Sequence, residues 1–197
     1  MTPIPLSDHG GKDFDVYENL NELPLKHWER FIAYTLEETP DFLSLIKDTY
    51  GINKKEMRRM PRYILDVIEA KYFEIMHEAN DIKPIEDVES TKLLPYGKWM
   101  DLEAMMKATA DNPSEFIKYL LVIALDKEYE SGDMEYLEAQ AAVKAEMPTK
   151  EALNYWAFFH STDPKLSQSM SLYSPRLKDL VEHLQPAEAN NLSNATE

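Results

Sequence analysis

The chain has no cysteine and only 5 glycines among its 197 residues. Without cysteine, it can form no disulfide framework, thiol nucleophile or thiolate metal site, which fits a reducing cytoplasm. The scarcity of glycine argues against a turn-rich β sandwich and against the glycine-rich loops that cradle phosphates. No apolar run reaches the roughly 20 residues that a membrane-spanning helix needs. The first residues lack a basic segment followed by an apolar stretch, so we expect no secretory signal.

Basic residues are also in short supply, with 21 Lys and Arg against 36 Asp and Glu and a net charge of −15. Such a charge repels nucleic acids and anionic membranes, whose recognition requires clustered Lys and Arg, so we expect neither as a partner. It favours solubility, and it leaves open binding to a basic protein face or imitation of DNA. One dense basic segment occurs at 54–62, and we interpret it as a face for self-association or pairing within the chain. Its basic residues are Lys54, Lys55, Arg58, Arg59 and Arg62.

A long apolar stretch dominates the second half of the chain. Asn112 can cap a helix there, Pro113 suits its first position, and Glu115 sits where a capping box places an acid. From Tyr119 to Leu125 no residue is charged, and such a run covers every side of about two helical turns. A helix that is apolar all round is normally buried. The sequence therefore predicts a buried central helix at about 113–128.

Apolar residues recur with helical spacing in most of the remaining chain, which predicts amphipathic helices around the central one. We expect them at about 25–38, 40–50, 53–60, 61–79, 102–110, 133–146 and 149–162. In the longest, the residues expected to face the core are Ile64, Leu65, Val67, Ile68, Tyr72, Ile75 and Met76. Prolines interrupt the segment 81–98, where we expect a short β hairpin or an ordered loop. The predicted fold class is therefore mainly α, a single-domain irregular helical bundle.

The composition at both ends of the chain sets the expected domain limits. Residues 1–14 hold two prolines and two glycines and are expected to form a flexible N-terminal arm. The helical domain is expected over 15–172. Residues 173–197 are expected to form a short helix and then a disordered tail, because the last residues offer few apolar side chains to pack.

Catalytic and metal-binding patterns are almost absent. The sequence contains no glycine-rich nucleotide loop, no GxSxG, no HExxH and no EF-hand loop. Glu74 and His77 form one Glu-x-x-His pattern, but a four-helix di-metal site needs that pattern twice and two further glutamates. We therefore expect no catalytic residue, no metal and no cofactor.

A methionine-rich segment after Pro95 is the best candidate for a partner-binding surface. Pro95 stiffens the approach to the segment, Gly97 gives backbone freedom, and methionine side chains can repack around different partners. The residues proposed to line an apolar groove are Tyr96, Trp99, Met100, Met105 and Met106. The alternative is that these side chains only close the core over the central helix.

Three segments in fixed order resemble a pattern of tailed-bacteriophage proteins. They are LLPYGKWMDLE, EFIKYLLVIALDKEY and MPTKEALNYWAFF, and the resemblance covers about residues 93–172. The pattern is similar to tail assembly chaperones and to related small virion-assembly proteins.

The resemblance implies a non-enzymatic helical protein that binds another virion protein, such as the tape-measure protein, in the host cytoplasm. Two alternatives remain open. One is a structural protein packaged in the virion. The other is an acidic DNA mimic that inhibits a host nucleic-acid enzyme.

Overall fold

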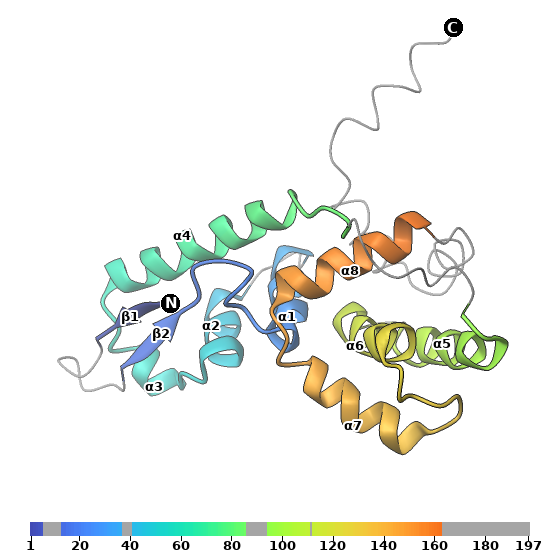
Figure 1. Ribbon diagram of the computed structural model, residues 1–197. Coiled ribbons are helices and arrows are strands. Elements are labelled where there is room, and N and C mark those ends of the chain that lie inside the picture. The colour runs from blue at the N-terminus through green and yellow to red at the C-terminus, as the bar shows by residue number, and fades with distance from the viewer. Residues whose placement is uncertain (6–12, 37–40, 86–93, 111, 163–197) are drawn as a thin grey trace, which may run out of the picture.

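The computed structural model describes residues 1–5, 13–36, 41–85, 94–110 and 112–162. This part of the chain forms eight helices and two short strands (Figure 1). The strands are β1 (Thr2–Ile4) and β2 (Phe14–Val16). The helices are α1 (Leu25–Leu36), α2 (Phe42–Tyr50), α3 (Lys54–Met57), α4 (Arg62–Ala79), α5 (Tyr96–Ala108), α6 (Pro113–Leu125), α7 (Met134–Lys144) and α8 (Thr149–Thr162). The predicted mainly α class is confirmed.

The elements gather around two groups of buried side chains. Figure 1 shows the hairpin with α2, α3 and α4 at one end of the molecule and α5, α6 and α7 at the other, with α1 and α8 between them. The smaller group joins the hairpin to α2, α3 and α4, and it includes Ile4, Val16, Ile46, Ile64 and Ile68. The larger group surrounds α6. Phe42 packs against both groups.

The helix α6 is the central helix that the sequence predicted. The Asn112 side chain accepts the backbone N–H of Glu115 at 2.9 Å, as expected for its cap. Helices α1, α5, α7 and α8 all contact α6. The residues with no exposed surface are Phe116, Ile117, Leu120, Leu121, Val122 and Ile123. The helix ends at Leu125, before the predicted residue 128, and Tyr119 is only partly buried.

Local signals also fixed several other helix ends. The Asp41 side chain accepts the backbone N–H groups of Leu43 and Ser44 at the start of α2. Gly51 ends that helix with φ of 68°, a left-handed conformation that costs glycine little. Asn53 and Glu56 form a capping box at the start of α3. These bounds lie within a few residues of the predicted ones.

The β hairpin lies at the N-terminus, where the sequence predicted a flexible arm. β1 pairs antiparallel with β2, with Thr2 opposite Val16 and Ile4 opposite Phe14. Ile4 and Val16 are buried against α2 and α4. Burial of these β-branched side chains on one face of the hairpin holds the segment to the body of the protein.

The last residues of the segment 81–98 are helical, whereas the sequence predicted a hairpin or an ordered loop there. Residues 96–98 form the first turn of α5, which starts at Tyr96 instead of residue 102. Pro95 precedes this start and favours it, since proline disfavours helix before itself and tolerates the position at a helix beginning. Residues 86–93 lie outside the described residues, as do the predicted C-terminal short helix and tail and the end of the predicted domain at 172.

The face of α4 that packs on the core is narrower than predicted. Ile64, Ile68, Tyr72 and Ile75 are buried as expected. Val67, which was placed in the same stripe, is 36% exposed and lies at the edge of the buried face.

The starts of α1 and α8 satisfy each other's backbone groups. The N–H of Leu25 donates to the carbonyl of Met147 at 2.9 Å. The N–H of Thr149 donates to the carbonyl of Leu23 at 2.8 Å, and its buried hydroxyl donates to the same oxygen at 2.7 Å. The first N–H groups of a helix have no partner inside it, so this exchange caps both helices.

The Glu78 carboxylate ties α4 to this junction. It accepts the backbone N–H of Leu20 at 2.8 Å and the ammonium group of Lys150 at 2.7 Å. Burial alone would raise the pKa of Glu78, but the hydrogen bonds from Lys150 and Leu20 outweigh it and lower the pKa below the ordinary value.

Substitution of Leu121 by Asp should unfold the protein. The carboxylate would enter the core without a partner, which costs several kcal/mol, a large part of the stability of about 5–15 kcal/mol of a typical domain. Thermal melting monitored by circular dichroism would test this. The control is Val143→Asp on α7, at a side chain that is 63% exposed, which should melt close to wild type. A Leu121→Asp protein that melts within two degrees or so of wild type would contradict a central role for α6.

The Glu78→Gln variant should lose about 1 kcal/mol of unfolding free energy at pH 7, because the ion pair with Lys150 is removed. The folded-state pKa of Glu78 is lowered, so its stabilisation is present above an unfolded pKa of about 4.3 and disappears as the pH falls through the folded value. Urea titrations at pH 7 and pH 3 should therefore show the gap between wild type and variant closing in acid. Glu146→Gln, which breaks an exposed pair with Lys26, should change little at either pH.

Candidate functional site

The helix α5 lies directly against the loop between α6 and α7. A Cβ atom on Gly97 would stand 2.6 Å from the Ser131 hydroxyl oxygen, closer than two such atoms can approach. Glycine at this position is therefore required for close contact between the helix and the loop. The sequence singled out Gly97 for backbone freedom, whereas the structure uses it for its small size.

The Asp101 carboxylate fixes α5 to that loop. One of its oxygens accepts the Tyr129 hydroxyl at 2.8 Å, the Ser131 hydroxyl at 2.6 Å and the backbone N–H of Gly132 at 3.0 Å. Burial, together with the hydrogen bond to Asp101, raises the pKa of Tyr129 to about 12. Asp101 lies in the middle of α5, so its side chain binds the loop and caps no helix.

Lys98 adds a second attachment between α5 and the loop. Its ammonium group donates to the backbone carbonyl of Asp126 at 3.1 Å and lies 5.2 Å from the centre of the Tyr129 ring. The Asp126 carboxylate in turn accepts the Tyr136 hydroxyl at 3.0 Å, which links the loop to α7. One side of α5 is thus held in place by polar contacts.

The five proposed groove residues divide between the two sides of α5. Met106 has no exposed surface and belongs to the core, and Trp99 and Met105 are partly buried against that core. Tyr96 and Met100 are 79% and 44% exposed. The five side chains therefore do not line one groove.

The exposed side of α5 carries an apolar stripe. Tyr96, Met100 and the exposed Ala104 follow one another at four-residue spacing, so they lie on one face of the helix. We call these three residues, with the edge of Trp99, the α5 outer face. Ala104 was absent from the sequence prediction, and four-residue periodicity from Tyr96 was the signal that could have found it.

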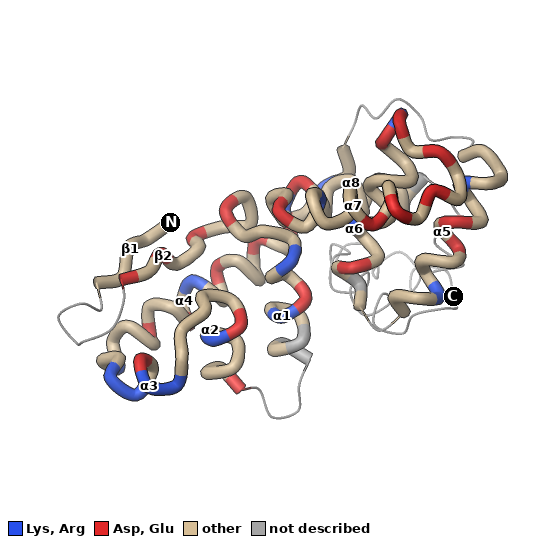
Figure 2. The backbone as a smooth tube through the Cα atoms, turned by 90° about the horizontal axis from the view of Figure 1, so that it is seen from below, with Lys and Arg blue, Asp and Glu red and all other residues tan. Residues whose placement is uncertain are grey.

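Acidic residues are abundant near α5. Figure 2 shows acidic residues in red in the part of the molecule that holds α5, α6 and α7. On the loop and α7 they are Asp126, Glu128, Glu130, Asp133, Glu135 and Glu138. On α5, Glu103 pairs with Lys107 at 2.8 Å. The loop lies on the attached side of α5, so its acids are on the other side of the helix from the α5 outer face.

The Glu-x-x-His pattern on α4 does not form a metal site among the residues that the structure describes. Glu74 pairs with Lys71 at 2.6 Å, and His77 is exposed. No group of three or more described His, Asp or Glu side chains is arranged to hold a metal ion.

The basic segment 54–62 lies on α3 and at the start of α4, where Figure 2 shows it in blue. Lys54, Lys55 and Arg58 are exposed, and Arg62 pairs with Asp66 at 2.8 Å.

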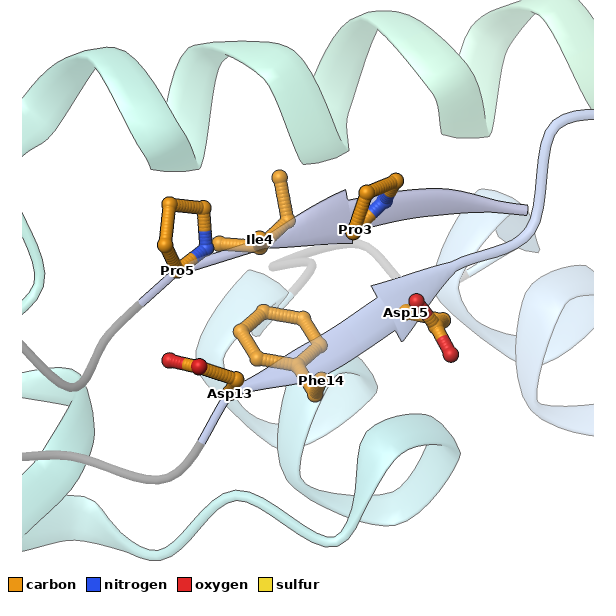
Figure 3. Close-up of a pocket in the computed structure, with 6 residues that line it drawn as sticks. All are labelled: Pro3, Ile4, Pro5, Asp13, Phe14 and Asp15. Atoms are coloured by element: carbon orange, nitrogen blue, oxygen red, sulfur yellow. The ribbon is translucent and has the colours of Figure 1, made fainter.

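A shallow hollow of about 410 Å³ opens beside the N-terminal hairpin (Figure 3). Its lining consists of Pro3, Ile4, Pro5, Asp13, Phe14 and Asp15. In Figure 3 the Ile4 side chain points toward α4, in agreement with its burial. The lining brings together no nucleophile and base, so this hollow is a weaker candidate than the α5 outer face.

Comparisons with protein-family models, with curated proteins and with solved structures found no match for this chain. None of the described helices has the length and apolar character needed to cross a bilayer.

The contact between Gly97 and Ser131 can be tested with a double-mutant cycle. Gly97→Ala should destabilise the wild-type background by about 1–2 kcal/mol, because the added methyl group collides with Ser131. In a Ser131→Gly background, the same change should stabilise by about 0.5–1 kcal/mol, since alanine is the better helix former. Urea unfolding of the four proteins measures both effects. Equal stabilisation in both backgrounds would show that the helix and the loop are not in close contact.

Proposed function

We propose that this protein is a non-enzymatic, chaperone-like factor of virion assembly that binds a helical segment of another virion protein on the α5 outer face. The observation that carries the proposal is the exposure of Tyr96 and Met100 on one side of a helix whose other side is anchored. The resemblance of residues 93–172 to tail assembly proteins supports the same reading, and it makes the tape-measure protein the first partner to test.

The attachment of α5 favours binding through its outer face. A surface gains more affinity from an apolar side chain when that side chain is already held in position. Asp101 and Lys98 attach α5 to the loop between α6 and α7. The exposed side chains of the helix therefore lose little freedom when a partner binds. Tyrosine and methionine are both enriched at protein interfaces, and methionine also adapts to varied partners.

The charge of the whole chain supports a partner of basic character. The protein carries a net charge of −15, which attracts a partner with exposed Lys or Arg. We therefore expect an amphipathic partner helix with apolar residues at spacings of three and four and with flanking Lys or Arg.

The two alternatives, an acidic DNA mimic and a structural protein packaged in the virion, require different features of the molecule. Every described helix carries at least one acidic residue, which supports a general negative charge more than one continuous strip shaped like DNA. A protein packaged in the virion could use the same α5 outer face. Mass spectrometry of purified particles separates that alternative from a chaperone, which leaves before the particle is complete.

The experiment is co-expression of the tagged protein with fragments of the tape-measure protein encoded in the same genome. Tyr96→Ala combined with Met100→Ala should weaken capture at least about tenfold, as expected for loss of exposed anchors at an interface. Its melting temperature should stay close to wild type, because both side chains are exposed.

The matched control combines Met134→Ala and Val143→Ala, two exposed apolar side chains on α7 that are 38% and 63% exposed. This control should capture the fragment as wild type does. Capture by the Tyr96/Met100 variant that equals wild type would remove the α5 outer face from the function. Failure of the wild-type protein to capture any fragment would remove the tape-measure protein as the partner.

A further inference from the structure

The helix α4 has a second apolar stripe on the side that faces away from the core. Tyr63 and Phe73 are 61% and 59% exposed, Val67 is 36% exposed, and Ala70 is also exposed. Their spacing of three and four residues puts them on one face, which we call the α4 outer face. Figure 1 shows α4 along one edge of the molecule, with the hairpin, α2 and α3 on its other side.

Charge changes sign along this face. Arg62 stands at the beginning of the helix, four residues after the exposed Arg58 of the basic segment. Glu74 stands near its end, and the exposed Asp81 follows the helix. The side chains of Arg62 and Glu74 are 82% and 57% exposed, so both reach solvent although each has a partner in its own helix.

We propose that the α4 outer face binds a second copy of this chain, with the two α4 helices antiparallel. The face is complementary to itself in that orientation. Tyr63 and Phe73 lie equally far from Ile68, so the tyrosine of each copy comes level with the phenylalanine of the other. Arg62 and Glu74 also lie equally far from Ile68, so the basic end of each α4 comes level with the acidic end of the other.

The sign of the charges selects the antiparallel orientation. Parallel helices would bring the two basic segments together and the two acidic ends together, and like charges at such close range are unfavourable. Ala70 and Val67 lie near the centre of the antiparallel pair, where a small side chain allows two helices to approach closely. The basic segment, unusual in a chain with a net charge of −15, then has a place beside the acidic end of the partner copy.

This dimer leaves the α5 outer face free. α4 and α5 lie at different ends of the molecule in both Figure 1 and Figure 2. A dimer would therefore present two α5 outer faces, and the proposal stands or fails separately from the proposed function.

Sedimentation velocity of the full chain between about 1 and 100 µM tests the proposal, a range that covers dissociation constants of typical weak to moderate dimers. Wild type should sediment as a dimer at the upper end of this range. Ala70→Glu should raise the dissociation constant at least about tenfold, because the new carboxylate lies at the centre of the interface and close to Asp66 of the second copy.

The matched control is Ala142→Glu on α7. Ala142 is exposed and lies four residues from Glu138 and from Glu146, as Ala70 lies four residues from Asp66 and from Glu74. Both substitutions therefore add a carboxylate four residues after an acid of the same helix, at an exposed alanine, and only Ala70→Glu should affect the dimer. A monomeric wild type, a dimeric Ala70→Glu protein, or equal dissociation of the control would each overturn the proposal.

Charge reversal tests the orientation. Arg62→Glu alone should weaken the dimer, because it adds a carboxylate to the end of α4 that lies level with the acidic end of the other copy. Adding Glu74→Arg to the same chain should restore the dimer, since the two ends of α4 then again carry opposite charges. A double variant no tighter than the single one would overturn the antiparallel arrangement.

Discussion

The requirement to cover α6 on nearly all sides determines the larger part of this structure. Six of its side chains have no exposed surface, and one helix or one sheet cannot enclose so many directions. Four helices, α1, α5, α7 and α8, share the task. α5 and α7 are neighbours of α6 in the chain, whereas α1 comes from the other half and must be brought back to it. The hydrogen bonds exchanged between the start of α1 and the start of α8 hold α1 beside the second half of the chain.

Much of the fold could be predicted from the sequence because its signals are local. Asn112 caps the helix that it was expected to cap. Asp41 and Asn53 cap α2 and α3 through equally local contacts, and Gly51 adopts the left-handed conformation that ends α2. An apolar run of seven residues is enough to identify a buried helix before any neighbour is known. In each case the cause and its effect lie within one or two helical turns.

The features that the sequence did not reveal depend on residues far apart in the chain. The role of Asp101 becomes visible only when Tyr129 and Ser131 are placed beside it. Gly97 looks like a flexible point until Ser131 occupies the space of its missing side chain. Val67 matches an inner stripe in the sequence alone, because α4 is apolar on two sides and periodicity does not say which side faces the core. Met106 and Tyr96 differ in the same way, one buried and the other exposed on a single helix.

The exchange between α1 and α8 also sets an order of events during synthesis. The hydrogen bond between the carbonyl of Leu23 and the N–H of Thr149 can form only after Thr149 has been synthesised, 126 residues after Leu23. At about 5–20 residues per second, that interval is on the order of 6–25 seconds. The smaller group of buried side chains, which joins the hairpin to α2, α3 and the first half of α4, lies within the first 68 residues and has that time to assemble. The nascent chain therefore carries an incompletely capped α1 for most of its translation, and the larger core closes only when the beginning of α8 has left the exit tunnel.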